Sequence, residues 1–398
     1  MPRLNQDYKQ SFLVNFLLTS SRLTNVVAPI TAIITALIVA TITIASLSSC
    51  SKQNDYAVQF DNYLYRLGNA TLQDVSIDKF HQDLIYPDEA HALPSKRLRT
   101  LPISDIRLNI SDLFRLNNYQ LLLNIIKRNT SLGKVMKPSQ QLIYEREILF
   151  SLSDCQQTLA TDKKSSDDTK AIINGILDIK KNEISHHYWN GLFSSIEFEK
   201  LFSVSKSPLS KQELQKLINI TQALEHYQMI GQELQNPAFN INTQELEQHF
   251  QQLQIENLMG RLLTTLTITS QYLNRGSQVL KKARSEHKLC ARSPNTSQQK
   301  ILKTVFFKYY IGDIQPYISL LDQQSKKIFN SIKGIYSKPK NHSQQKPLQV
   351  FFETIYGNRD SQRTTSTVNF FDLAIKKHTR AWQSLLTDCD LMPKVPVS

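Results

Sequence analysis

Leu209-Ser210-Lys211-Gln212-Glu213-Leu214 contains every residue type that a helix start requires. The Ser210 hydroxyl is placed to accept a hydrogen bond from the Glu213 amide, and the Glu213 carboxylate to accept one from the Ser210 amide. Leu209 and Leu214 flank this pair and are able to pack together. The spacing Asn242-x-x-Glu245 predicts a second helix start, followed by apolar residues at helical spacing toward Arg284.

The composition of the whole chain agrees with helices. Ten glycines among 398 residues are too few for an architecture of many strands and turns, while an apolar content of 40% and 18 Phe support a packed core. We therefore predict an all-α fold, a multi-helix body with bundle-like or orthogonal packing, over residues 56–398. The charged stretch 161–169 is a predicted linker, and the place where this body would divide into two domains.

Glycine and proline positions predict where helices begin, bend and end. Gly68 is expected to end a first helix that starts near Asn54, and Pro138 to open a helix at its first turn. Gly260 is expected to bend the long helix after Asn242, and Pro316 to end or kink another after Gln315. An extended segment is predicted over residues 84–103, which contain Pro87, Pro94 and Pro102.

The first fifty residues have the layout of an export signal. Three cations, Arg3, Lys9 and Arg22, precede the uncharged apolar run 26–47. Leu47-Ser48-Ser49-Cys50 then matches a bacterial lipoprotein processing site, at which a signal peptidase would cut between Ser49 and Cys50 and the Cys50 thiol would be acylated. In this interpretation residues 1–49 are a signal peptide, residues 50–55 a lipidated tether, and residues 56–398 a periplasmic domain.

A second interpretation of the apolar run stays open. Its length exceeds the usual signal core of about 7–15 residues and approaches the roughly 20 that span a bilayer. Without cleavage the segment would be a signal anchor and the protein a structural subunit of an envelope complex. We favour cleavage, because a cysteine rarely falls behind Leu-Ser-Ser by chance in a chain with four cysteines. Ser51, where an aspartate would retain a lipoprotein in the inner membrane, favours the outer membrane.

The formal net charge of +13 indicates a surface that attracts anions. For an exported protein the expected partners are phospholipid headgroups, lipopolysaccharide phosphates or cell-wall carboxylates, or else an envelope protein; nucleic acid is not expected. Most of the cations are nevertheless scattered in a way typical of solvated helix faces. Five pairs of adjacent lysines are distributed along the chain: Lys163-Lys164, Lys180-Lys181, Lys281-Lys282, Lys326-Lys327 and Lys376-Lys377.

Two groups of residues resemble a known family. The first is Asn129-Thr130-Ser131-Leu132-Gly133-Lys134-Val135 with Tyr144-Glu145 and Cys155, and the second is Val305-Phe306 with Tyr310 and Ile314-Gln315-Pro316-Tyr317. Their order resembles the proteobacterial lipoprotein family called domain of unknown function 3080, over nearly all of the mature chain. The resemblance implies an envelope location and assigns no activity, ligand or catalytic residue. This chain departs from it at Tyr119, where a cysteine is expected.

Three cysteines remain if Cys50 is acylated, and an odd number leaves one thiol over in an oxidising compartment. We favour a disulfide between Cys290 and Cys389, since both stand beside loops in the C-terminal half. The resemblance is consistent with this choice, because a family cysteine replaced here by Tyr119 would explain an unmatched Cys155.

No catalytic or metal-binding motif stands out. Ser131-x-x-Lys134 and Ser285-x-x-Lys288 both match a short pattern of penicillin-binding enzymes, but its other elements are missing. Glu183-x-x-His186 matches one of the two Glu-x-x-His elements of a helical di-metal site, and the second element is absent from the sequence. The side chains of the adjacent histidines 186 and 187 diverge by about 100° on a helix, so we do not expect them to bind one metal together. We expect no cofactor and no metal, and a binding or envelope-assembly protein without catalysis; a cell-wall or lipid-directed hydrolase is the alternative.

Overall fold

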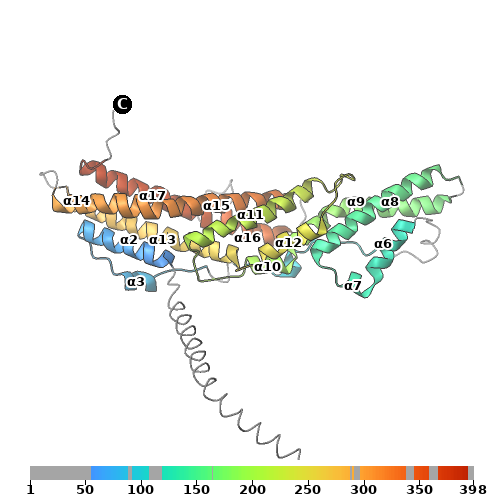
Figure 1. Cartoon of the computed structure of the whole chain (residues 1–398), viewed down its shortest axis with the longest axis horizontal. Helices are drawn as coiled ribbons and strands as arrows, with labels where there is room; N and C mark the ends of the chain where they lie inside the picture. The colour runs from blue at the N-terminus through green and yellow to red at the C-terminus, as the bar shows by residue number, and fades with distance from the viewer. Residues whose placement is uncertain are drawn as a thin grey trace, which may run out of the picture. The chain divides into compact units, whose positions relative to one another are not determined.

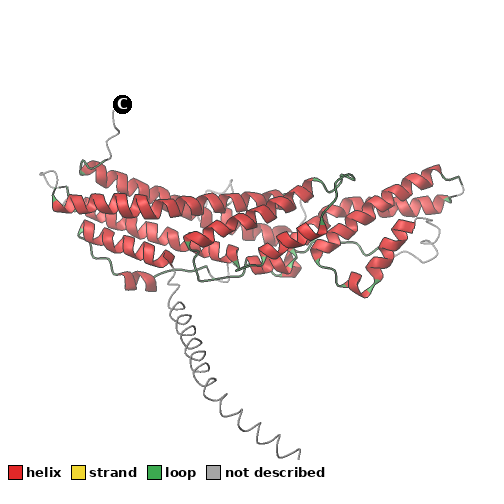
Figure 2. Cartoon of the chain, viewed as in Figure 1, coloured by secondary structure: helices red, strands yellow, loops and turns green. Residues whose placement is uncertain are grey.

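A computed structural model describes residues 55–87, 92–106, 119–163, 165–286, 289–290, 296–337, 345–357 and 366–392. The chain divides into two compact units, Met1–Asp55 and Tyr56–Ser398, and the fold described below is that of the second. Every regular element in the described residues is a helix, as Figure 2 shows, so the predicted all-α class is confirmed. No helix among these residues is both long and apolar enough to cross a membrane.

The helices follow one another in three stretches of the chain. The first stretch contains α2 (Asp55–Thr71), α3 (Ile77–Gln82), α4 (Lys96–Arg99), α6 (Tyr119–Asn129), α7 (Ser131–Lys134) and α8 (Pro138–Thr161). The second contains α9 (Asp167–Phe193), α10 (Ile196–Leu201), α11 (Lys211–Gln232), α12 (Thr243–Leu253) and α13 (Leu258–Ser285). The third contains α14 (Ser297–Thr304), the π-helix η2 (Val305–Ile314), α15 (Gln315–Tyr336), α16 (Lys346–Tyr356) and α17 (Thr367–Asp388).

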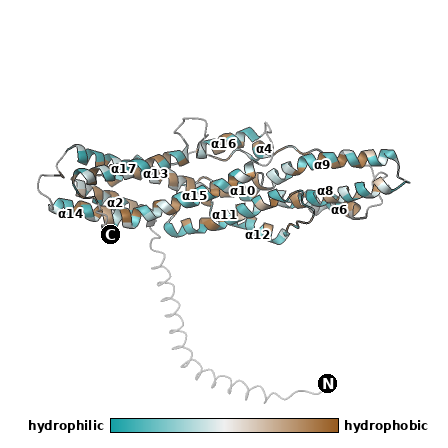
Figure 3. Cartoon of the chain, turned by 90° about the horizontal axis from the view of Figure 1, so that it is seen from above, coloured by the Kyte–Doolittle hydropathy of each residue, from teal (hydrophilic) through white to brown (hydrophobic). Residues whose placement is uncertain are grey.

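Paired helices bury the core. The closest pairs are α13 with α17, α8 with α9, and α11 with both α15 and α12, and Figure 1 shows α8 and α9 as a hairpin. The predicted linker near residues 161–169 is the short loop of this hairpin. Apolar and polar residues alternate along the helices in Figure 3, as expected where one face of each helix is buried.

The capping box at the start of α11 is confirmed. The Ser210 Oγ atom accepts a hydrogen bond from the Glu213 amide (3.3 Å), and the Glu213 carboxylate accepts one from the Ser210 amide (2.8 Å). This turn also joins three helices. The Leu209 amide donates to Thr265 on α13, and the Leu209 carbonyl accepts from Tyr317 on α15. A local signal in the sequence therefore marks a junction of the tertiary structure.

Two predicted helix boundaries are wrong. Helix α2 continues past Gly68 to Thr71, and Gly68 is instead where Val75 and the Gln73 carbonyl approach the helix too closely for a Cβ atom. The long helix after Asn242 is broken before Gly260, at residues 254–257, where Glu256 and Asn257 have positive φ angles. Gly68 admits the turn that follows α2, and Gly260 admits the carbonyl of the distant residue Ser203, so a close approach of the chain explains both glycines.

Pro316 does not end its helix. The chain runs without interruption from α14 through η2 into α15, and Pro316 lies in the first turn of α15. A proline clashes with the carbonyl four residues earlier in an α-helix, and the wider π-helical turn preceding it relieves that clash. Helix α16 was not expected, although Pro347 lies in its first turn as Pro138 does in α8.

Residues 92–103 of the proline-containing segment are extended apart from the single turn α4, and α9 holds them in place. The Asn190 side chain accepts a hydrogen bond from the Leu101 amide and donates one to the Leu101 carbonyl. It therefore pairs with the extended backbone as the backbone of a neighbouring β-strand would. The Trp189 indole donates to the Arg99 carbonyl (2.8 Å), and the buried Arg99 guanidinium donates to the Phe193 carbonyl and to Glu199. The segment is therefore a fixed part of the fold.

Candidate functional site

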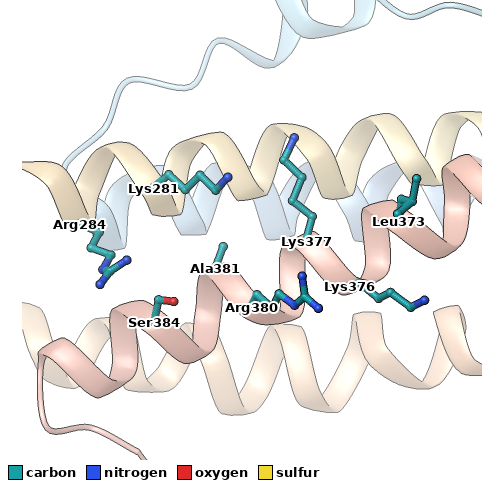
Figure 4. Close-up of a pocket in the computed structure, with 8 residues that line it drawn as sticks. All are labelled: Lys281, Arg284, Leu373, Lys376, Lys377, Arg380, Ala381 and Ser384. Carbon is teal, nitrogen blue, oxygen red and sulfur yellow. The ribbon is translucent and has the colours of Figure 1, made fainter. Parts of the chain in front are cut away.

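The surface between the parallel helices α13 and α17 carries a groove of about 530 Å³. The two helices are in register at two levels, since Gly276 contacts His378 and Arg284 contacts Asp388. Figure 4 shows Lys281 and Arg284 extending from α13, and Lys376, Lys377 and Arg380 from α17. Leu373, Ala381 and Ser384 complete the lining. Five cations and no carboxylate therefore line one groove.

Four of these cations form no ion pair with a carboxylate in the described part of the chain. Lys281, Lys376, Lys377 and Arg380 are exposed, and no ion pair joins them to a described residue. Only Arg284 is neutralised, because its Nε atom lies 2.5 Å from Asp388 Oδ2, an ion pair that raises the pKa of Arg284. Like charges on two rigid helices repel one another, and a bound anion would relieve that repulsion.

One large apolar side chain lines the groove among the cations, and a second lies one turn nearer the start of α17. Leu373 lines the groove and is 45% exposed, whereas Phe370 is 41% exposed and lines a neighbouring hollow. Spacings of three, four and three residues separate Phe370, Leu373, Lys377 and Arg380, so these four side chains share one helix face. The surface combines phosphate-binding chemistry with exposed apolar area.

The interpretation of the lysine pairs as scattered is wrong at this groove. Lys281-Lys282 and Lys376-Lys377 are almost one hundred residues apart in sequence, and the packing of α13 on α17 brings Lys281, Lys376 and Lys377 together. The helical register of each segment was visible in the sequence. The sequence did not show which helices pack side by side, and it is this packing that brings the positive charges together.

The family-like residues Asn129, Ser131, Gly133 and Lys134 form the turn from α6 to α8. The Gly133 amide donates to Thr130 Oγ1 (3.1 Å), and the Arg128 guanidinium donates to the Gly133 carbonyl. A Cβ atom at Gly133 would collide with the carbonyls of Lys127 and Arg128, so only glycine fits. Ser131 is exposed and makes no described hydrogen bond to Lys134, so this Ser-x-x-Lys pair is part of a tight turn.

Asn129 and Lys134 line a cleft of about 790 Å³ between α6, α8 and α9. Inside it, the Lys180 Nζ atom lies 2.5 Å from Glu145 Oε2, and His187 Nε2 lies 3.7 Å from the same oxygen. The Nε2 atom of His187 is buried without a hydrogen-bond partner among the described residues, and burial lowers the pKa of His187 to about 4. Neutral His187 faces a cleft whose remaining walls combine apolar residues of α6, α8 and α9 with polar ones such as Asp105, Arg128 and Gln141.

The second family-like group is structural. Tyr317 is buried, and its hydroxyl donates to the Leu209 carbonyl (2.6 Å), while Gln315 and Pro316 form the junction of η2 and α15. None of these three residues lines the groove or the cleft. Glu183 and His186 have a similar role, since they bind Ser104 and the Pro102 carbonyl of the extended segment.

Cys290 and Cys389 are joined by a disulfide, which is the pair that the sequence analysis favoured. Cys155 lies buried on α8, outside this bond, and burial raises the pKa of its thiol. The proposed cleavage and acylation residues, Ser49 and Cys50, lie outside the described residues, as do positions 287 and 288 of the second Ser-x-x-Lys pattern.

The fold and the groove define an all-helical protein whose packed helices assemble a basic surface from distant segments. A family model described as "Protein of unknown function (DUF3080)" matches residues 60–393. The chain therefore belongs to this family, as its motifs predicted. No curated protein and no solved structure matches the chain.

Proposed function

We propose that the protein is a lipoprotein of the bacterial envelope, anchored through acylated Cys50 and facing the periplasm, whose basic groove binds phosphate groups of anionic membrane lipids. The observation that carries this proposal is the convergence of Lys281, Lys376, Lys377 and Arg380 on one groove without an ion pair to a described carboxylate. An outer-membrane location is part of the proposal, because Ser51 follows the cysteine.

The position of the groove relative to the first helix supports this function. Only residues 51–54 separate Cys50 from α2. Helix α2 packs directly on the groove helix α17, since the Tyr63 hydroxyl lies 2.6 Å from His378 Nε2. A lipid attached just before α2 would tether the helical body, and the groove helix α17 with it, to the membrane.

The expected affinity follows from the number of cations. A lysine or arginine near an anionic bilayer contributes about 1 kcal/mol, so four contribute about 4 kcal/mol, or roughly a thousand-fold in partitioning. Exposed Phe370 and Leu373 add apolar contact at the interface. The acyl chains would anchor the protein, and the groove would orient its body on the membrane.

Cosedimentation of residues 51–398 with phosphatidylglycerol vesicles tests the groove. We expect binding to anionic vesicles, little binding to phosphatidylcholine vesicles, and weakening by salt. Joint replacement of Lys281, Lys376, Lys377 and Arg380 by glutamine should reduce partitioning at least 100-fold. The control replaces four exposed lysines elsewhere by glutamine, which removes the same charge: Lys211, Lys300, Lys303 and Lys333. Equal losses in both variants would mean that net charge, not the groove, binds the vesicles.

Mass spectrometry of membrane-extracted protein tests the anchor. A mature chain that begins at an acylated Cys50 is expected, and Cys50→Ala should leave the full-length precursor unprocessed. An intact peptide containing Met1 in the wild-type protein would contradict lipidation and favour the uncleaved signal anchor.

A further inference from the structure

The helical hairpin of α11 and α12 brings together two histidines and a glutamate that the basic groove does not involve. His226 lies on α11, and Glu245 and His249 lie four residues apart on α12. Residues at this spacing share a helix face, and the hairpin turns that face toward His226. One ligand atom from each residue lies within 4.8 Å of those from the other two.

The details of the cluster fit a cation better than they fit a structural contact. The imidazole rings of His226 and His249 stack with centroids 4.4 Å apart and an interplanar angle of 29°. His226 Nδ1 lies 3.7 Å from Glu245 Oε1, too far for a hydrogen bond. The other ring nitrogen of His226 is buried and makes no hydrogen bond within the described residues. The hydrogen bonds of the fold therefore do not explain why this histidine stands here.

We propose that His226, Glu245 and His249 bind one zinc-class divalent transition cation. Two imidazole nitrogens and a carboxylate oxygen are ligands that zinc prefers, whereas calcium and magnesium require oxygen ligands. A tetrahedral zinc site places its ligand atoms roughly 3.4 Å apart, so closure from the present spacing requires a shift of about 1 Å. The Glu245 side chain is 50% exposed and free to supply that movement.

Three protein ligands leave a fourth position of a tetrahedral site for water or a further ligand. The exposed side of the cluster is the side of Glu245, because the His226 side chain is only 13% exposed. The cation would also connect α11 to α12 and would stabilise the hairpin that leads into α13.

Isothermal titration of residues 51–398, prepared without a polyhistidine tag, with Zn²⁺ and separately with Mg²⁺ tests this site. We expect one Zn²⁺ bound per chain and no Mg²⁺ binding. His249→Ala and Glu245→Gln should each weaken Zn²⁺ binding at least tenfold, while the melting temperature without metal stays near that of the wild type. Zn²⁺ should raise the melting temperature of the wild-type protein and not that of His249→Ala.

His186→Ala is the matched control, because Glu183-x-x-His186 also places a histidine beside a carboxylate on a helix but gathers no third ligand in the described structure. This variant should bind Zn²⁺ as tightly as the wild type. Absence of stoichiometric Zn²⁺ binding, or binding that His249→Ala and Glu245→Gln leave unchanged, would overturn the proposal. Failure of vesicle binding at the basic groove would not affect it, since the two sites share no residue.

Discussion

His378 is a fully buried titratable side chain. It lies in the core on α17, where its Nε2 atom is 2.6 Å from the Tyr63 hydroxyl and its Nδ1 atom 3.3 Å from Ser277 Oγ. The Trp382 indole donates to the same Tyr63 hydroxyl (2.8 Å). Burial lowers the pKa of His378 to about 3, so the imidazole is neutral in this hydrogen-bonded chain.

A buried neutral histidine makes stability depend on pH. The unfolded chain binds a proton at this side chain below about pH 6.5, whereas the folded chain does not until about pH 3. The contribution of neutral His378 to the free energy of unfolding is therefore fully present above pH 6.5 and is lost as the pH falls toward 3. Between pH 7 and pH 5, we expect it to remove about 2 kcal/mol from the free energy of unfolding.

Urea unfolding of the wild type and of His378→Gln at pH 7 and pH 5 measures this loss. Glutamine stays uncharged and retains a hydrogen-bonding group near Tyr63, so the variant should lose about 2 kcal/mol less than the wild type over the interval. His187, whose pKa is also lowered, remains in both proteins and adds the same pH dependence to each. Identical losses would show that His378 is not buried as described.

At the scale of the elements, two glycines within helices have different surroundings that the sequence does not distinguish. Gly260, in the first turn of α13, meets the Ser203 carbonyl so closely that a Cβ atom would overlap it. Gly175 lies in the exposed middle of α9 with nothing within 4 Å of a Cβ atom. Gly260 was expected to bend a helix, and the structure shows that it admits a neighbouring backbone.

These two glycines predict opposite results for the same substitution. Gly260→Ala should destabilise the protein by about 1–3 kcal/mol, because backbone must move to admit the methyl group. Gly175→Ala should stabilise it by about 0.5–1 kcal/mol, because alanine favours a helix and meets no obstacle. Denaturant midpoints of both variants measure the effects. A stabilised Gly260→Ala protein would contradict the close approach of α13 to Ser203.

Helix starts with side-chain caps were predictable and helix ends were less so. Ser210 and Asn242 cap their helices as the sequence indicated, because a cap involves residues within three positions of one another. The end of α2 and the break before α13 depend on contacts with distant residues. The same reason explains α16, whose buried side chains Phe351 and Phe352 meet Phe202 and Phe193 from another part of the chain.

At the scale of the whole molecule, the disulfide links two distant parts of the chain covalently. Cys290 follows α13 and Cys389 ends α17, so the bond ties together the two helices that form the basic groove, 99 positions apart in sequence. Loss of this bond should lower the free energy of unfolding by up to about 4 kcal/mol in the chain-entropy description.

Guanidinium unfolding with and without reductant tests this contribution. Reduction should shift the midpoint of the wild type, but not that of the double variant Cys290→Ser and Cys389→Ser. Cys155→Ala is the control for the remaining buried cysteine, and it should keep the wild-type response to reductant. A response that disappears in Cys155→Ala would show that Cys155 takes part in the bond.

Local patterns of the chain were sufficient for the helical class, the caps at Ser210 and Asn242, and the family, because each depends on residue types at short spacings. The basic groove, the cleft around Glu145 and the cluster of His226, Glu245 and His249 were decided by the tertiary structure. Glu245-x-x-x-His249 was visible as a helical spacing, but His226 joins it only through the hairpin. Helical periodicity determines which face of a helix is polar, and only the packing of one helix against another determines which polar faces meet.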